Sequence, residues 1–173
     1  MFRLFWTLLA IFSCFVVWNY TTKEEKKTTH ECYSSPKQEP VPPCLQMYYS
    51  IEKYSEKYKV PKKIAYGIAH SETRYLGPFH WEYDPKLTSH AGAMGPMQVM
   101  YATAQMMWPG KKITKSMVLD DIDFNVETSM KALAHLYQRY EDWKIVLGCY
   151  NTGMPIINSY SYKVLAFNPN WKN

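Results

Sequence analysis

The chain has few of the residues that build metal sites. Its four cysteines are spread over 173 residues without a Cys-x-x-Cys pair, so the usual zinc signature is absent. His80, His90 and His135 show no ligand spacing either. We therefore expect no metal ion and no other cofactor.

The signals of β-structure are equally scarce. No stretch alternates between apolar and polar residues for long, and no Asn-Gly or Asp-Gly hairpin turn occurs. Extensive sheet is therefore improbable. Serine nucleophile elbows and phosphate-binding loops are also missing, which excludes the enzyme classes built on them.

The charge is modest and evenly spread. The net charge is +5, with Asp and Glu placed between the Lys and Arg residues instead of a basic block. That balance suits a polyanionic surface such as a cell wall. No nucleic-acid-binding motif accompanies it, so we expect no nucleic acid partner.

The N-terminus carries an uncharged apolar run from Leu4 to Trp18, bounded by Arg3 and by the charged stretch 23–27. Residues 2–20 are just long enough to span roughly 30 Å of hydrocarbon at about 1.5 Å per residue. We expect a membrane anchor or signal segment over 1–20, with bulky residues after the run favouring retention over cleavage. The body then faces the periplasm or the cell exterior, and a cleaved segment makes the protein secreted. Ile11 to Cys14 also faintly resembles a lipobox.

Residues 21–43 are polar and contain four prolines, which indicates an extended linker. Cys32 and Cys44 flank most of it and form a disulfide in one interpretation, which leaves Cys149 single; free thiols are the alternative. The remaining residues, 44–173, are expected to form one domain.

That domain is predicted to be mainly α-helical. Apolar residues recur at steps of three and four, and capping residues flank the segments. Asp121 or Asp123 is expected to cap the fourth helix, Asp142 to cap the fifth, and Gly153 to end the fifth. The expected helices are 45–59, 61–72, 95–107, one from 121 or 123 to 140, 142–153, and a last one within 156–167.

One acidic residue stands at an unusual place. In the second predicted helix Ile64, Ile68 and Glu72 follow one another at intervals of four, so the carboxylate continues the apolar face. A carboxyl group shielded at a buried helix end has a raised pKa, as a proton donor working near neutral pH requires.

Three segments share the order of a known family. They are Ser71-Glu72-Thr73, the stretch 89–100 with Ser89, Gly92-Ala93 and Gly95-Pro96-Met97-Gln98, and Cys149-Tyr150-Asn151-Thr152-Gly153. With Val60-Pro61 ahead of Glu72, residues of about 45 to 155 resemble the soluble lytic transglycosylases of the lysozyme-like superfamily. The resemblance implies a lysozyme-like helical domain.

The same resemblance implies a site and a substrate. Glu72 would be the general acid and base, and the substrate-binding positions would be Ser89, Gln98, Met100, Tyr150 and Asn151. The substrate would be peptidoglycan glycan strands, cleaved between MurNAc and GlcNAc to give 1,6-anhydro ends. The chain can be bacterial or phage-encoded.

The sequence departs from the family pattern at three places. Pro96 replaces Leu and Thr73 replaces Ser, and the loop after Glu72 is longer by roughly residues 74–83. This loop contains Glu82 and precedes Asp84, two rival acids. We favour Glu72 because it ends an apolar helical face.

Two other functions stay open at this point. In a hydrolytic lysozyme a second acid would position water, and the candidates are Glu82, Asp84, Asp120 and Asp121. In a catalytically silent wall-binding or assembly protein, the same fold would bind glycan without cleaving it.

Overall fold

The structure is a computed structural model that describes residues 40–172. The predicted anchor, most of the predicted linker, and Cys32 lie outside the described residues. The anchor and the division into 1–20, 21–43 and 44–173 therefore stay predictions. In the described structure Cys44 is a buried free thiol, so the disulfide interpretation is not supported there. Within residues 40–172, no helix is both long and apolar enough to cross a bilayer.

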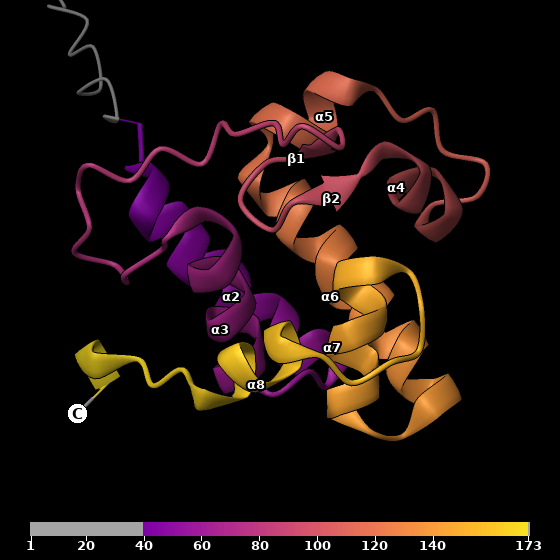
Figure 1. The fold of residues 1–173 in the computed structure, drawn as a ribbon. Helices are drawn as coiled ribbons and strands as arrows, with labels where there is room; N and C mark the ends of the chain where they lie inside the picture. Colours follow the sequence, from indigo (N-terminus) through magenta and orange to yellow (C-terminus); the bar gives the residue numbers. More distant parts are fainter. Residues whose placement is uncertain (1–39, 173) are drawn as a thin grey trace, which may run out of the picture. The chain divides into compact units, whose positions relative to one another are not determined.

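The described part is mainly helical, as predicted (Figure 1). In chain order its elements are α2 (Pro43–Tyr58), α3 (Lys62–Thr73), β1 (Ala93–Met94), β2 (Val99–Met100), α4 (Tyr101–Met107), α5 (Lys115–Asp120), α6 (Ile122–Tyr140), α7 (Trp143–Thr152), α8 (Ser159–Ala166) and the 3-10 turn η1 (Asn170–Lys172).

Helix α6 is the element on which the others assemble. It packs against α2, α4, α5, α7 and strand β2, and Figure 1 shows α2 and α3 on one side of it and α4 on the other. Val126, Met130 and Leu133 of α6 are fully buried. The central helix therefore supplies much of the apolar core.

A polar seam joins α2 to α6 at the edge of this core. Asp123 accepts hydrogen bonds from the Ser50 hydroxyl at 2.8 Å and from the Tyr54 hydroxyl at 2.5 Å. Glu127 accepts from the Lys57 ammonium at 2.5 Å. These hydrogen bonds and ion pairs therefore link α2 to α6 at the edge of their apolar contact.

The predicted helix ends are largely confirmed. Asp121 caps α6 by accepting from the Phe124 N–H at 2.9 Å, and Asp142 caps α7 by accepting from the Lys144 N–H at 2.7 Å. Gly153 ends α7 in the left-handed conformation with φ 76°. Helix α5, capped by Thr114, was not predicted, and α8 begins at Ser159, three residues after 156.

The prediction of a helix starting at Gly95 was wrong. Strands β1 and β2 pair antiparallel, residues 95–98 form the turn between them, and α4 begins only at Tyr101. Gly95 and Gln98 have positive φ, at 72° and 50°, which interrupts a helix.

The cause of this hairpin lies on α6. The Asn125 amide donates to Met94 O at 2.9 Å and to Val118 O at 2.7 Å, and its oxygen accepts from Met97 N–H at 3.0 Å. A Cβ on Gly95 would lie 2.5 Å from the Asn125 nitrogen, so only glycine fits there. A buried asparagine therefore satisfies the backbone groups of Met94 and Met97 on either side of the turn.

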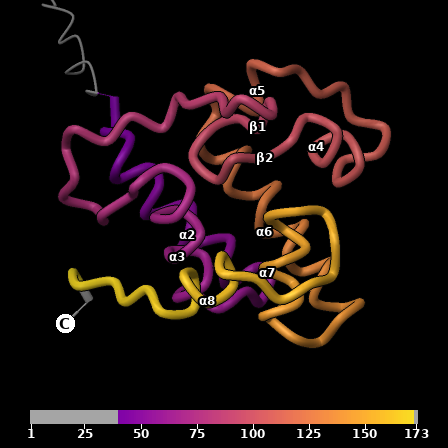
Figure 2. Tube along the Cα trace, in the orientation of Figure 1, coloured from indigo at the N-terminus to yellow at the C-terminus, as the bar shows by residue number. Residues whose placement is uncertain are grey.

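The last α-helix of the domain, α8, packs against α3. Helix α8 lies beside α3, although most of the domain separates them in sequence (Figure 2). Gly67 of α3 permits this contact, because a Cβ there would lie 2.5 Å from the Val164 carbonyl of α8. The end of α3 and the start of α8 form the centre of the candidate site.

Candidate active site

Glu72 lies in the last turn of α3 and is half-buried. The apolar face from which this helix was predicted is buried. Ile64 is 4% exposed and Ile68 is 0% exposed. Burial raises the pKa of the Glu72 carboxyl above its usual value, while a hydrogen bond from Tyr160 and the positive charge of Lys163 oppose the rise. The net direction favours the protonated acid.

The hydrogen bond comes from α8. The Tyr160 hydroxyl donates to Glu72 Oε1 at 2.5 Å. Burial and the negative charge of Glu72 raise the pKa of Tyr160 far above its usual value. The phenol therefore stays a hydrogen-bond donor at all ordinary pH values and fixes the orientation of the carboxyl group.

Tyr150 of α7 lies near the same carboxyl group. Burial is the main cause that raises the pKa of Tyr150, and the charge of Glu72 adds to the rise. Its hydroxyl donates to Met97 O at 2.6 Å and pairs with the Ser129 hydroxyl at 2.9 Å. Tyr150 thus joins α7 to the hairpin turn and α6, but its hydroxyl is not bonded to Glu72.

Thr73 connects the end of α3 to the hairpin and to the long loop. Its hydroxyl lies 2.9 Å from Pro96 O and 2.8 Å from the Tyr83 hydroxyl. Tyr83 is buried, although it belongs to the loop after Glu72, which is longer than in the family pattern. The residue that departs from the family pattern at position 73 therefore holds three segments together beside Glu72.

Ser89 and Gln98 have structural roles in the described conformation. The Ser89 hydroxyl accepts from Ala93 N–H at 3.0 Å, and the Gln98 amide donates to Leu87 O and Gly95 O, both at 3.0 Å. Both side chains therefore shape the hairpin turn and its approach. Their predicted contact with substrate stays a prediction.

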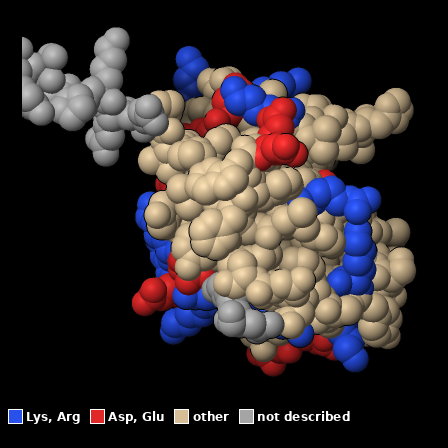
Figure 3. Space-filling model, turned by 90° about the vertical axis from the view of Figure 1, so that its left-hand side faces the viewer, with Lys and Arg blue, Asp and Glu red and all other residues tan. Residues whose placement is uncertain are grey.

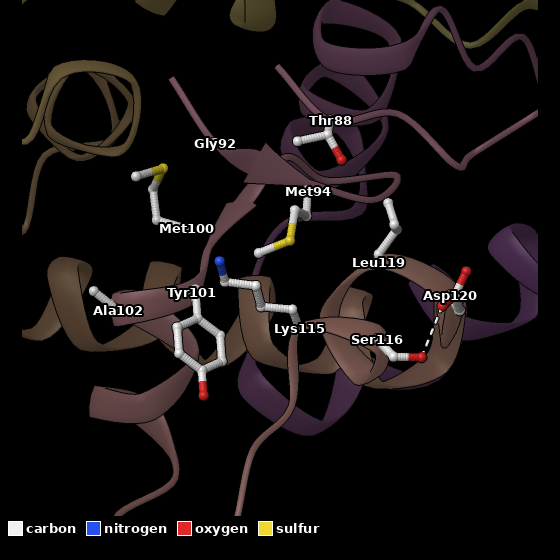
Figure 4. Close-up of a pocket in the computed structure, with 10 residues that line it drawn as sticks. All are labelled: Thr88, Gly92, Met94, Met100, Tyr101, Ala102, Lys115, Ser116, Leu119 and Asp120. Carbon is white, nitrogen blue, oxygen red and sulfur yellow. Dashed lines mark hydrogen bonds between the residues drawn. The ribbon is translucent and has the colours of Figure 1, made fainter. Parts of the chain in front are cut away.

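Met100 and Asn151 are both exposed. Met100 is 43% exposed and lines a cavity of about 700 Å³, together with residues of α5 such as Lys115 and Ser116 (Figure 4). The Asn151 oxygen accepts from the Asn158 amide at 3.2 Å, which links the end of α7 to the start of α8. Neither side chain is hydrogen-bonded to Glu72. Within residues 40–172, the hydrogen bond to the Glu72 carboxyl comes from Tyr160.

The rival acids lie in a different environment. Glu82 and Asp84 are exposed on the loop between α3 and β1. Asp84 accepts from the backbone N–H of Lys86 at 2.9 Å, a local turn contact. Both side chains therefore lie in solvent, whereas Glu72 is half-buried at the end of α3.

Comparison with known proteins identifies the family of this domain. The model of the transglycosylase SLT domain matches residues 49–166, more than half of the chain. The chain belongs to this family. No curated protein matches it.

Solved structures support the fold of this SLT transglycosylase domain. The 70-kDa soluble lytic transglycosylase of Escherichia coli is 24% identical with a TM-score of 0.51. The complex of a 70-kDa soluble lytic transglycosylase with bulgecin A is 23% identical, also with a TM-score of 0.51. Each match covers 67% of this chain but only 18% of the other chain. At this identity the likeness concerns the fold.

Within the SLT domain, sequence reasoning missed Tyr160. The final helix was expected from its apolar residues, but nothing local distinguishes Tyr160 from Tyr162, which is 58% exposed. An aromatic residue on a helix after Tyr150-Asn151 was the only available signal. Its contact with Glu72 spans 88 residues and depends on how α8 packs on α3.

Proposed function

We propose that this protein is a peptidoglycan lytic transglycosylase that cleaves glycan strands between MurNAc and GlcNAc, with Glu72 as its acid and base. The observation that carries the proposal is the half-buried Glu72 carboxyl, whose pKa is raised by burial and whose Oε1 accepts from Tyr160 at 2.5 Å. Membership of the SLT family supports the substrate class.

The reaction begins with a proton transfer. Protonated Glu72 donates its proton to the glycosidic oxygen, and the bond from that oxygen to C1 of MurNAc breaks as the GlcNAc hydroxyl leaves. The N-acetyl group of MurNAc stabilises the positive charge that develops at C1. Glu72 is then a carboxylate, and Tyr160 stabilises its charge by donating a hydrogen bond.

Ring closure completes the cycle. The Glu72 carboxylate removes the proton from the C6 hydroxyl, and that oxygen bonds to C1, which gives a 1,6-anhydro sugar and restores the protonated acid. No water is consumed. One acid is therefore enough, whereas hydrolysis by the two-carboxylate route needs a second one.

Two of the acids that a hydrolytic mechanism would recruit, Asp120 and Asp121, are engaged elsewhere. Asp121 caps α6, and Asp120 accepts from Ser116 at 2.8 Å and pairs with Lys86 at 3.3 Å. Glu82 and Asp84 are exposed on a loop. These contacts support the transglycosylase over the lysozyme.

The experiment is digestion of purified sacculi with the full-length protein, followed by mass analysis of the released muropeptides. We expect 1,6-anhydro ends from the wild-type protein and none from Glu72→Gln, which should fold normally. Reducing ends without anhydro sugar would favour the hydrolytic lysozyme. Binding to sacculi without any release would favour a silent wall-binding protein.

We also propose that the domain works outside the cytoplasm, where its substrate lies, and that the N-terminal apolar run anchors it to the membrane. The uncharged stretch from Leu4 to Trp18 supports this location. Carbonate extraction of membranes from cells that express the full chain tests it: the protein should stay in the pellet, and release into the supernatant would refute an anchor.

A further inference from the structure

A second concave surface lies between the start of α2, the loop after α3 and the turn η1. It is a groove of about 570 Å³ lined by Leu45, Tyr48, Tyr49, Pro78, Phe79 and Trp171. None of these residues takes part in the hydrogen bonds around Glu72 and Thr73 described above. Its lining residues are therefore distinct from the residues that hold the Glu72 carboxyl in place.

Half of the residues that line this groove lie outside the range matched by the family model. Leu45 and Tyr48 precede the matched range 49–166, and Trp171 follows it. Pro78 and Phe79 belong to the long loop after Glu72. The lining therefore joins residues from both sides of the matched range to the loop after Glu72.

The base of the groove is held by aromatic contacts. The Trp171 ring meets Tyr66 edge to face at 5.3 Å and Tyr75 at 5.9 Å between ring centroids. Tyr48 stacks on Tyr66 at 6.5 Å. Because Tyr66 and Tyr75 are fully buried, these contacts fix the groove before any ligand arrives.

Two aromatic side chains at the rim of the groove, in contrast, are exposed to solvent. Phe79 is 71% and Tyr49 is 58% exposed, far more than aromatic side chains in a core. Exposed apolar side chains that gather around a concave surface are a feature of interaction sites. Phe79 and Tyr49 are therefore available to a ligand.

The lining of the groove is uncharged. It contains four aromatic residues, one leucine and one proline, and no Lys, Arg, Asp or Glu. Figure 3 views the molecule from the side of the loop that follows α3. It shows a broad uncharged centre, with the charged residues towards the margins. A neutral ligand with apolar faces suits such a surface.

We propose that this groove binds the glycan strand of peptidoglycan outside the catalytic cleft; this rests on the proposed function. A pyranose ring has a face of C–H groups that packs on an aromatic ring, and hydroxyls at its edge that bond to tyrosine hydroxyls. The backbone sugars are neutral, as is the lining. A concave groove with tyrosine at its wall fits a sugar chain better than the flat surface of a bilayer.

The test uses the full-length Glu72→Gln protein, so that the probe is not cleaved. Chitohexaose, a soluble β-1,4 chain of GlcNAc, is titrated while the Trp171 indole N–H resonance is followed, since this ring lines the groove and not the surroundings of Glu72. We expect the resonance to shift and saturate. Phe79→Ala and Tyr49→Ala should weaken binding at this resonance by about threefold to tenfold.

The matched control is Trp81→Ala. Trp81 lies in the same loop and is 61% exposed, but it does not line the groove. Its replacement should leave the affinity at Trp171 unchanged. Circular dichroism should show that all three variants fold, as expected for exposed positions.

Three results would overturn the proposal: an unshifted Trp171 resonance at saturating sugar, equal weakening by Trp81→Ala, or binding of phosphatidylglycerol vesicles in place of sugar. The proposed activity fails on a different result, the absence of anhydro ends from the wild-type protein. The two failures are therefore distinguishable.

Discussion

At the scale of single residues, the site consists of one carboxyl group on which burial is opposed by the Tyr160 hydrogen bond and the Lys163 charge. Burial at the end of α3 favours the neutral acid, and the hydrogen bond from Tyr160 favours the carboxylate. The proposed reaction uses both forms in turn. A residue that stabilises the charged form without abolishing the raised pKa therefore suits an acid that later becomes a base.

Tyr160→Phe tests this balance. Without the phenol, the pKa of Glu72 should rise further, because the hydrogen bond that lowers it is lost. We expect kcat/KM to fall about tenfold, and the limb of the pH profile where activity is lost through deprotonation of the acid should move to higher pH. Tyr162→Phe, an exposed tyrosine on the same helix, is the control. An unmoved limb in Tyr160→Phe would contradict the role.

The raised pKa also predicts how stability depends on pH. The folded state binds the Glu72 proton more tightly than the unfolded chain, so its contribution to stability is complete below the unfolded value, 4.5, and is lost as pH rises through the folded pKa. Glu72→Gln should therefore be at least as stable as the wild type at pH 7, with the relative advantage shrinking towards pH 4. Chemical denaturation at both pH values measures this. A variant that is relatively less stable at pH 7 than at pH 4 would contradict it.

At the scale of elements, the hairpin shows where local signals were overruled. Gly95-Pro96 is a good start for a helix by local rules, and the residues after it have helical spacing. The side chain of Asn125 takes the backbone groups of Met94 and Met97 instead. The hydrogen bonds of Asn125, on α6, therefore determine the conformation of the turn that contains Met97 and Gln98.

Replacing Asn125 with Ala tests the origin of this turn. Three buried backbone groups would lose their partner, and we expect a loss of about 2–4 kcal/mol in the free energy of unfolding. Urea denaturation followed by circular dichroism measures it. Asn170→Ala, at an exposed position in η1, should change stability by less than about 0.5 kcal/mol. A similarly small effect at Asn125 would show that the turn forms without it.

At the scale of the whole molecule, the site depends on the return of α8 to α3. Glu72 and Tyr160 come from the two ends of the domain, and Gly67 allows the backbone of α8 to approach. Tyr150, on α7, ties the hairpin turn to α6 nearby. The catalytic arrangement is therefore a property of the complete helical assembly.

Gly67→Ala should disturb this assembly. A Cβ 2.5 Å from the Val164 carbonyl forces α8 away, which we expect to cost about 1–3 kcal/mol and to lower activity through the lost Tyr160 contact. Unfolding curves and sacculus digestion measure the two effects. In the described part of the chain the Ser71 hydroxyl is buried without a hydrogen-bond partner, so Ser71→Ala on the same helix should cost little stability. Wild-type activity in Gly67→Ala would contradict the proposed dependence.

The sequence by itself determined α2, α3, α6 and α7, the caps formed by Asp121, Asp142 and Gly153, and the place of Glu72 at the end of an apolar face. These features follow from periodicity and from side chains that bond to backbone a few residues away, so a short window of sequence contains their causes. Tertiary structure decided the hairpin, the packing of α8 and the contact between Tyr160 and Glu72. Their causes lie in residues far apart in the chain, Asn125 for the turn and Gly67 for α8, and such contacts exist only once the core has brought the helices together.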